Sequence, residues 1–343
     1  MQQHTLKLDP RHLVLPGAAV IVALLLAALL EGAARLPPVQ AALPPPSVGA
    51  PHPFMDLKVN RLDALVAEHG EVDCIFVGSS VVDRGIDIVA LAAAYEAATG
   101  EPLTCFNFGL SRTSVFDAAS LLALLDARYN PDLLVYGTSF REFDSGFGNT
   151  AQTIQVAWSQ HQLDNPSLSG WLAENAMAYR YILAGVLWLT QPATWEERVE
   201  RESIIDAYGY SPEYTVATRE DLYAPPSDYV QSAAASYTVD TTQMDGLRAI
   251  NTLREAGVPV LLVEIPLPDV TYELVGEDAY QDFRTQVGGY TQQTGLPYWE
   301  TRALDLVPPD GWKDRGHVNV VGAEAFSRWL GERLAQTDLL PGG

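Results

Sequence analysis

Beyond residue 55, short runs of apolar and β-branched residues alternate with longer segments of helical periodicity. This alternation is typical of βαβ units, in which a parallel sheet carries helices on both faces. The pattern predicts an α/β domain with a doubly wound, mostly parallel sheet in three layers. Strands are expected at residues 73–77, 103–108, 132–136 and 258–264, and helices at residues 57–68, 88–98, 114–127, 243–256 and 323–335.

An insert at about residues 140–236 follows the third predicted strand and shows no clear period. It is rich in aromatic residues, which could stack on sugar rings or meet a lipid chain. A helical subdomain that packs its own core is the favoured interpretation. The whole domain, with this insert, is expected to span residues 55–338.

The N-terminal segment predicts a membrane element. Residues 13–30 contain no charged side chain, and at 1.5 Å per residue a helix of this length nearly spans a bilayer. Lys7 and Arg11 precede the stretch, so the positive-inside rule places the N-terminus in the cytoplasm and the rest of the chain outside. Residues 1–35 are therefore interpreted as a cytoplasmic tail and a single-pass transmembrane signal anchor.

Two further features of the N-terminal region affect this interpretation. Residues 39–41 resemble a small-residue cleavage site, so a cleaved signal peptide is the alternative to a retained anchor. Residues 36–54 contain seven prolines and predict a semi-rigid, polyproline-like linker. Such a linker would hold the domain away from the membrane.

The charge and cysteine content exclude several classes of function. With 43 acidic against 21 basic residues the net charge is -22, which repels phosphate backbones and argues against nucleic acid as a partner. Cys74 and Cys105 lie in apolar runs and predict buried free thiols, with a disulfide between them as the alternative. No phosphate loop, dinucleotide fingerprint or metal-ligand spacing is present, so no cofactor or metal is predicted.

Candidate chemistry lies just after the predicted strands, because open parallel sheets bind ligands at the carboxyl ends of their strands. Polar turns at residues 78–80, 107–112 and 137–139 occupy these positions. A serine nucleophile needs a base, usually histidine, and His317 before the last helix is the best placed of the six histidines. Asp314 precedes it by three residues and can orient its imidazole.

Together these residues resemble the SGNH (GDSL-like) hydrolases over about residues 73–334. Gly78, Ser79 and Ser80 stand where the family has Gly-Asp-Ser, which implies that Ser80 is the nucleophile. Asp314 and His317 match the family's last block, which completes a catalytic triad. The Gly-Ser-Ser form is similar to that of membrane-linked branches that transfer acyl groups to alginate, peptidoglycan and teichoic acid.

The two middle blocks of the family supply the oxyanion hole, which the resemblance assigns here to Gly109, Arg112 and Ser139. Arg112 replaces a usual glycine, where it is interpreted as a surface ion pair or as a cation facing an anionic substrate. Ser139 offers a hydroxyl where the family has an asparagine. Losing one oxyanion donor costs about 3 kcal/mol, so the enzyme is expected to be slow, selective or inactive.

The residues and the resemblance together predict a membrane-anchored, extracytoplasmic serine esterase or O-acyltransferase. Its expected substrate is an acyl ester, in particular an acetyl ester, of a cell-surface glycan or of a small molecule. A membrane acyltransferase is a candidate partner. The alternative is a non-catalytic SGNH-like module that binds a surface polymer or scaffolds such an acyltransferase.

Overall fold

The computed structural model describes residues 11–145 and 154–340, and the sheet predicted from the sequence is present. Within these residues five parallel strands form it in the order β2-β1-β3-β4-β5. This is the strand order of doubly wound, flavodoxin-like sheets, so the predicted α/β class is confirmed. The strands are β1 (Cys74–Gly78), β2 (Cys105–Gly109), β3 (Leu133–Thr138), β4 (Val260–Glu264) and β5 (Tyr298–Trp299).

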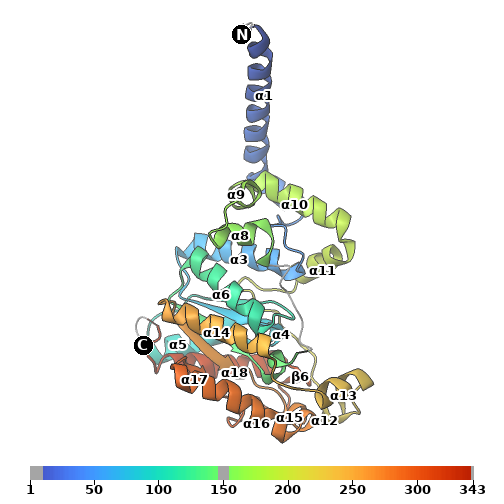
Figure 1. The fold of residues 1–343 in the computed structure, drawn as a ribbon, viewed down its shortest axis with the longest axis vertical. Helices are drawn as coiled ribbons and strands as arrows, with labels where there is room; N and C mark the ends of the chain where they lie inside the picture. The colour runs from blue at the N-terminus through green and yellow to red at the C-terminus, as the bar shows by residue number, and fades with distance from the viewer. Residues whose placement is uncertain (1–10, 146–153, 341–343) are drawn as a thin grey trace, which may run out of the picture.

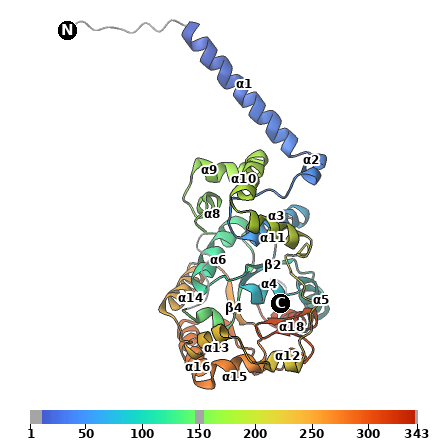
Figure 2. The same ribbon diagram turned by 90° about the vertical axis from the view of Figure 1, so that its right-hand side faces the viewer.

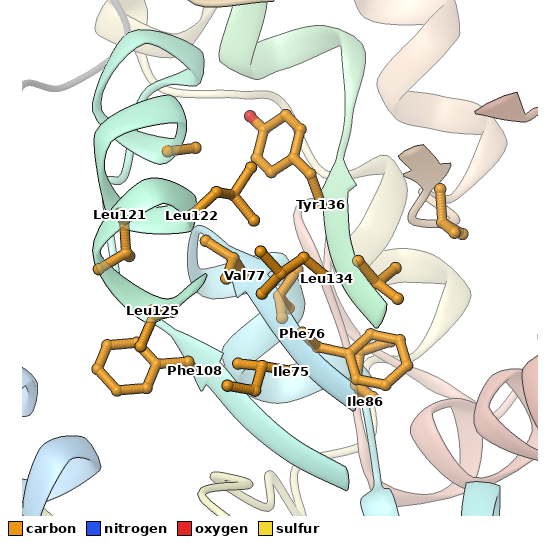
Figure 3. Close-up of a cluster of buried hydrophobic side chains, with 14 of the residues drawn as sticks. Ile75, Phe76, Val77, Ile86, Phe108, Leu121, Leu122, Leu125, Leu134 and Tyr136 are labelled. Carbon is orange, nitrogen blue, oxygen red and sulfur yellow. The ribbon is translucent and has the colours of Figure 1, made fainter. Parts of the chain in front are cut away.

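Helices cover both faces of the sheet and make three layers (Figure 1). α6 (Val115–Tyr129) packs beside α14 (Thr241–Glu255), and α5 (Ile88–Thr99) packs beside α18 (Val320–Leu334). Figure 3 shows how apolar side chains of α6 meet those of the strands, with Leu122 beside Val77 and Tyr136. Because strand side chains alternate between the two faces, a run buried throughout, such as Cys74–Gly78, must be covered on both sides.

The insert forms short helices that lie in two separate places (Figures 1 and 2). Its first part lies near α3 (Pro53–His69), and its second part lies near α15 (Asp269–Val275). The first part consists of α8 (Ala157–Gln162), α9 (Leu168–Asn175), α10 (Met177–Thr190) and α11 (Pro192–Glu202), and the second of α12 (Arg219–Tyr223) and α13 (Asp228–Ala235).

Other elements were not expected from the sequence, because they are short and leave little room for a recognisable period. They are α2 (Pro37–Ala42), α4 (Ser80–Gly85), the 3-10 turn η1 (Phe140–Phe143), α16 (Glu277–Phe283), η2 (Arg284–Gly288), α17 (Gly289–Thr294), β6 (Trp312–Asp314) and β7 (His317–Val318).

The helix α1 (Arg11–Ala34) projects from the body of the protein (Figures 1 and 2). Its C-terminal end is held by α10, where the Glu31 carboxylate accepts hydrogen bonds from Met177 N at 3.0 Å and Ala178 N at 2.9 Å. In the part of the chain that the structure describes, no helix has the length and apolarity needed to cross a bilayer. The predicted cytoplasmic tail, including Lys7, lies outside the described residues.

The Pro-rich segment is not the extended spacer that its composition predicts. Part of it forms α2, and Ser47 and Val48 are buried against the body. Arg198 of α11 donates hydrogen bonds to the carbonyl oxygens of Pro45 at 2.9 Å and Pro46 at 2.8 Å. The prolines have no N–H to donate, but their carbonyl oxygens can still accept hydrogen bonds, and the Arg198 side chain supplies the donors.

The expectation of two free thiols is wrong, because Cys74 and Cys105 form a disulfide. The two cysteines are register partners on the adjacent parallel strands β1 and β2, with Cα atoms 4.5 Å apart. Disulfides persist in oxidising compartments and are rare in the cytosol. Pairing of this kind depends on strand register, which the spacing of 31 residues does not reveal.

Candidate active site

The carboxyl ends of β1, β2 and β3 meet at one edge of the sheet. Gly78 of β1 pairs in register with Gly109 of β2 and with Gly137 of β3. The loops that follow these glycines therefore lie side by side, and two of them carry Ser80 and Ser139. Since β1 has β2 on one side and β3 on the other, this edge is the topological switch point at which doubly wound sheets bind ligands.

Ser80 is the first residue of α4, directly after β1, and it is half-buried. Ser79 occupies the N-cap position with extended backbone and caps the helix with its side chain. A Cβ atom on Gly78 would overlap the carbonyl oxygen of Gly137 and the side chain of Val82. Glycine is required at position 78 because the turn passes so close to β3. The close approach of the backbone therefore accounts for the glycine, and the helix cap accounts for the serine that follows it.

A short antiparallel hairpin of β6 and β7 presents Asp314 and His317, which are register partners. The backbone N–H of Gly316, in the turn between them, donates to Asp314 Oδ1 at 2.7 Å. The hairpin comes just before α18, whose N-cap Asn319 accepts hydrogen bonds from the first turn of that helix. The aspartate, the histidine and the helix entry therefore belong to one hydrogen-bonded segment.

The structure brings Ser80, His317 and Asp314 within hydrogen-bonding distance of one another. Ser80 Oγ lies 2.8 Å from His317 Nε2, and His317 Nδ1 lies 3.0 Å from Asp314 Oδ1 and 3.2 Å from Asp314 Oδ2. A proton on Nδ1 faces the carboxylate and leaves Nε2 to accept the serine proton. This is the relation of nucleophile, base and orienting acid that defines a serine triad.

The surroundings of the histidine favour its neutral form. Burial lowers the pKa of His317; the Asp314 carboxylate opposes this, and the positive charges of Arg84 and Arg141 lower the pKa further. Burial alone would raise the pKa of Asp314, but the hydrogen bond and charge of His317 outweigh it and hold that pKa at about 2. Near neutral pH the pair is therefore an ionised carboxylate beside an imidazole able to accept a proton.

Glu142 connects the loop after β1 to the loop after β3. Its carboxylate accepts hydrogen bonds from the Ser79 hydroxyl, from Thr138 Oγ1 at 2.7 Å and from the Ser139 N–H at 2.5 Å. Burial raises the pKa of Glu142, and these three donors together with the charge of Arg141 act in the opposite direction. Glu142 is fully buried, and its carboxylate braces the two loops.

Gly109, assigned to the oxyanion hole by the resemblance, has its backbone N–H already engaged. It donates to the side-chain Oδ1 of Asn107 at 3.0 Å. The Asn107 amide in turn donates to the carbonyls of Val82 at 2.8 Å and Ile86 at 2.9 Å. Asn107 thereby joins β2 to the helix that carries Ser80, and the hydrogen bond from Gly109 N–H holds the Asn107 side chain in place.

Ser139 and Arg112 keep groups that could face a reacting carbonyl. The Ser139 hydroxyl is buried and donates to no group of the described residues. Arg112 has φ of 66°, the left-handed region that favours glycine, so its conformation matches the glycine usual at this position. Its side chain is exposed and forms no ion pair within residues 11–145 and 154–340, so the predicted surface ion pair is not found.

His52, which the sequence placed in the linker, contacts the loop that carries Arg112. Phe54 N donates to His52 Nδ1 at 3.2 Å, so Nε2 carries the proton and donates to the Ser111 carbonyl at 3.0 Å. Burial lowers the pKa of His52 and keeps the ring neutral. The sequence holds no motif that would reveal this contact, since 59 residues separate the partners.

A buried ion pair supports the helix that carries Ser80. Lys58 and Asp83 are both fully buried and lie 2.7 Å apart, and Lys58 Nζ also donates to the Asn107 carbonyl at 3.0 Å. Ser211 Oγ donates to the same Asp83 oxygen at 2.9 Å. Arg84, the next residue of this helix, contacts Glu213 at 3.3 Å. The signal in the sequence that could have revealed a buried role for Lys58 is its position as a lone lysine on an otherwise apolar face of its helix.

A cavity of about 490 Å³ opens beside the histidine. Helices of the insert and of the segment after β4 form its walls, so the residues around it come from distant parts of the chain. They include Phe140, Ala234, Tyr237, Leu274, Arg315 and His317.

The chain matches no model of a known protein family, and no curated protein is significantly similar to it. Within the described ranges, no group of three or more His, Cys, Asp or Glu side chains is arranged to hold a metal ion. The assignment of function therefore rests on the geometry of the site and on the resemblance of its motifs.

Proposed function

We propose that this protein is a serine esterase or O-acyltransferase whose mechanism resembles that of the SGNH hydrolases. The observation that carries the proposal is the chain of contacts from Ser80 Oγ to His317 Nε2 at 2.8 Å and from His317 Nδ1 to Asp314 at 3.0 Å. A hydroxyl, an imidazole and an ionised carboxylate in this order form an activated nucleophile.

In the first half of the reaction Ser80 Oγ attacks the ester carbonyl carbon while His317 Nε2 takes the hydroxyl proton. The bond to the alcohol oxygen then breaks, and His317 gives its proton to that leaving oxygen. In the second half, water or a sugar hydroxyl attacks the acyl carbon while His317 takes its proton. The bond from the acyl carbon to Ser80 Oγ then breaks, which releases the acid or the new ester, and His317 returns the proton to Oγ. Asp314 stabilises the imidazolium in both halves.

The negative charge on the carbonyl oxygen needs donors at the same edge of the sheet. We assign this role to the backbone N–H groups of Ser80 and Arg112 and to the Ser139 hydroxyl. Gly109 is left out because its N–H is occupied by Asn107. This set of three donors differs from the set that the resemblance implied. Its only side-chain donor is the Ser139 hydroxyl, which reaches less far than the amide of an asparagine.

We further propose that the domain acts outside the cytoplasm and is attached to a membrane through its N-terminal segment. The Cys74–Cys105 disulfide supports an oxidising compartment. The uncharged stretch at residues 13–30 supports membrane attachment, and its side chains from residue 18 onward are exposed. The resemblance to acyl-transfer proteins supports an acylated cell-surface glycan as substrate and a membrane acyltransferase as partner.

A non-catalytic polymer-binding module is the second candidate. The observation that favours it is the loss of one expected oxyanion donor, since Gly109 N–H is engaged and Ser139 replaces an asparagine. An arranged triad argues against it, because polymer binding does not require a nucleophile aligned with a base.

Two measurements on the detergent-solubilised full chain test the proposal. The first is release of p-nitrophenol from p-nitrophenyl esters, compared between wild type, Ser80→Ala and His317→Ala. Both substitutions are expected to lower kcat by about 10⁴-fold or more. The second is labelling by a serine-reactive phosphonate, with the modified peptide expected to contain Ser80.

Matched controls exist for both substitutions. Ser203→Ala and His69→Ala make the same chemical changes at exposed positions and should leave hydrolysis and labelling unchanged. Labelling without hydrolysis would favour a transferase that requires its own acceptor. If Ser80 is neither labelled nor needed for hydrolysis, the enzymatic proposal is wrong and the binding module is left.

A further inference from the structure

The cavity beside His317 has walls that are mostly apolar. Val230, Ala233 and Ala234 of α13 line one side, and Leu274 and Val275 of α15 line the other. Figures 1 and 2 both place α12, α13 and α15 together at one end of the domain. The cavity volume of about 490 Å³ lies in the range of small-molecule sites.

The inner wall of the cavity is already packed in the structure. Phe140 is 1% exposed, and its ring meets that of Tyr237 edge to face with centroids 5.5 Å apart. The Tyr237 hydroxyl donates to the Phe140 carbonyl at 2.9 Å. Phe140 directly follows Ser139, so the wall of the cavity is continuous with the loop that offers the oxyanion donor.

Two of the basic groups at the rim are engaged by the protein itself. Lys313 lies 2.6 Å from Glu213, and Arg315 donates to the carbonyls of Leu222, at 2.6 Å, and Ala224. These contacts also hold α12 against the hairpin that carries the histidine. The lining also contains a third cation, Arg141, and three carboxylates, those of Asp144, Asp221 and Asp314. Because the positive and negative groups of the lining balance, the cavity is suited to an uncharged apolar group rather than to an anion.

The cavity also opens directly beside the candidate triad. Asp314, Gly316 and His317 form part of its wall, so it opens beside the imidazole that contacts Ser80 Oγ. An ester carbonyl held at Ser80 can direct its apolar chain into this space. The methyl of an acetyl group would leave most of it empty.

We propose that this cavity binds the acyl chain of the ester and selects an aliphatic acyl group of medium length over acetyl. The proposal rests on the proposed esterase or acyltransferase function and narrows its substrate class. Each additional buried methylene contributes about 0.8 kcal/mol of transfer free energy, so the preference should grow stepwise with chain length until the cavity is filled.

The test compares kcat/KM of the full chain for p-nitrophenyl acetate, butyrate, hexanoate and octanoate. Butyrate is expected to exceed acetate by about 10-fold, since two more methylenes are buried. Ala234→Phe fills the cavity and should lower the ratio of hexanoate to acetate by about 10-fold. Ala235→Phe is the matched control, because Ala235 is the exposed next residue of α13 and does not line the cavity.

If wild type prefers acetate, or if both phenylalanine variants leave the ratio unchanged, the acyl-chain proposal is overturned while the esterase proposal stands. If wild type cleaves none of these esters, binding is measured by thermal unfolding with ethyl hexanoate in a Ser80→Ala background. A rise in Tm that Ala234→Phe removes and Ala235→Phe retains would support the cavity. No rise in any variant would overturn the proposal.

Discussion

The loops that hold Ser80 and His317 differ in one respect from the loops after β2 and β3. In the first pair, the reactive side chains contact one another, with Ser80 Oγ at 2.8 Å from the imidazole. In the second pair, several polar groups are engaged in the fold: Gly109 N–H binds Asn107, and Ser139 N–H binds Glu142. The loops of Ser80 and His317, called here the outer loops because they come first and last in the chain, carry side chains that contact one another. The loops after β2 and β3, called here the middle loops, carry groups engaged mainly in support of the fold.

This difference has a physical basis. A nucleophile and its base interact over hydrogen-bonding distance and require side chains with few alternative partners. Oxyanion donors are mostly backbone groups, and a backbone N–H in a tight loop is readily taken by a neighbouring side chain. In the loops after β2 and β3, the Asn107 and Glu142 side chains take two such N–H groups, so fewer backbone donors remain free there.

The largest expected effect concerns the outer loops. We expect Ser80→Ala combined with His317→Ala to lower kcat by about 10⁴-fold, no further than either substitution alone, because the two groups act as one unit. Single-turnover measurements on an ester of the preferred acyl length would provide the values. Losses that multiply in the double variant would show that the two residues act independently and would contradict the triad.

A smaller effect is expected in the middle loops. Ser139→Ala should lower kcat by about 10²-fold with KM little changed, because the hydroxyl would bind the oxyanion in the transition state alone. Ser139→Asn should restore activity, since asparagine offers a longer donor. Equal activity of Ser139→Ala and wild type would remove this residue from the oxyanion hole.

The pH profile should follow the histidine. The base works in its neutral form, so kcat/KM should rise with pH and level off above the pKa of His317, which lies below the ordinary value of 6.5. Asp314→Asn removes the carboxylate that raises this pKa, so the midpoint should shift to lower pH while the plateau falls. A midpoint that stays in place in Asp314→Asn would contradict the assigned contact.

The smallest expected effect is on stability, at Arg112. A non-glycine residue with φ of 66° carries a strain of about 1 kcal/mol, so Arg112→Gly should raise the free energy of unfolding by no more than this amount. Chemical denaturation measures the change. We expect kcat/KM to be unchanged, because the substitution keeps the backbone N–H, whereas a clear loss would show that the guanidinium contacts the substrate.

Much of the fold was predictable because it depends on local patterns. The β-branched runs became β1 to β4, and the periodic segments became α3, α5, α6, α14 and α18. The insert was not predictable in detail, since its short helices are stabilised by distant contacts such as the Arg198 bonds to the Pro-rich segment. The free thiols and the extended spacer were predicted wrongly for the same reason.

The candidate site also contains residues that the sequence could identify and residues that it could not. Ser80, Asp314 and His317 could be named from the sequence, because residue type and position after a strand or before a helix restrict the candidates. The bracing role of Glu142 could not be predicted, because its partner Ser79 lies 63 residues away along the chain. His52 and Lys58 were missed, since their partners lie 59 and 25 residues away along the chain.

By itself the sequence determined the parallel sheet, the loops at its carboxyl edge and the residue types able to perform acyl chemistry. It did so because the period of apolar residues and the chemistry of a side chain are local properties. The tertiary structure alone decided which donors are free, which cysteines pair and that α13 and α15 enclose a cavity. Those features depend on contacts between residues far apart in the chain, which exist once the layers have packed.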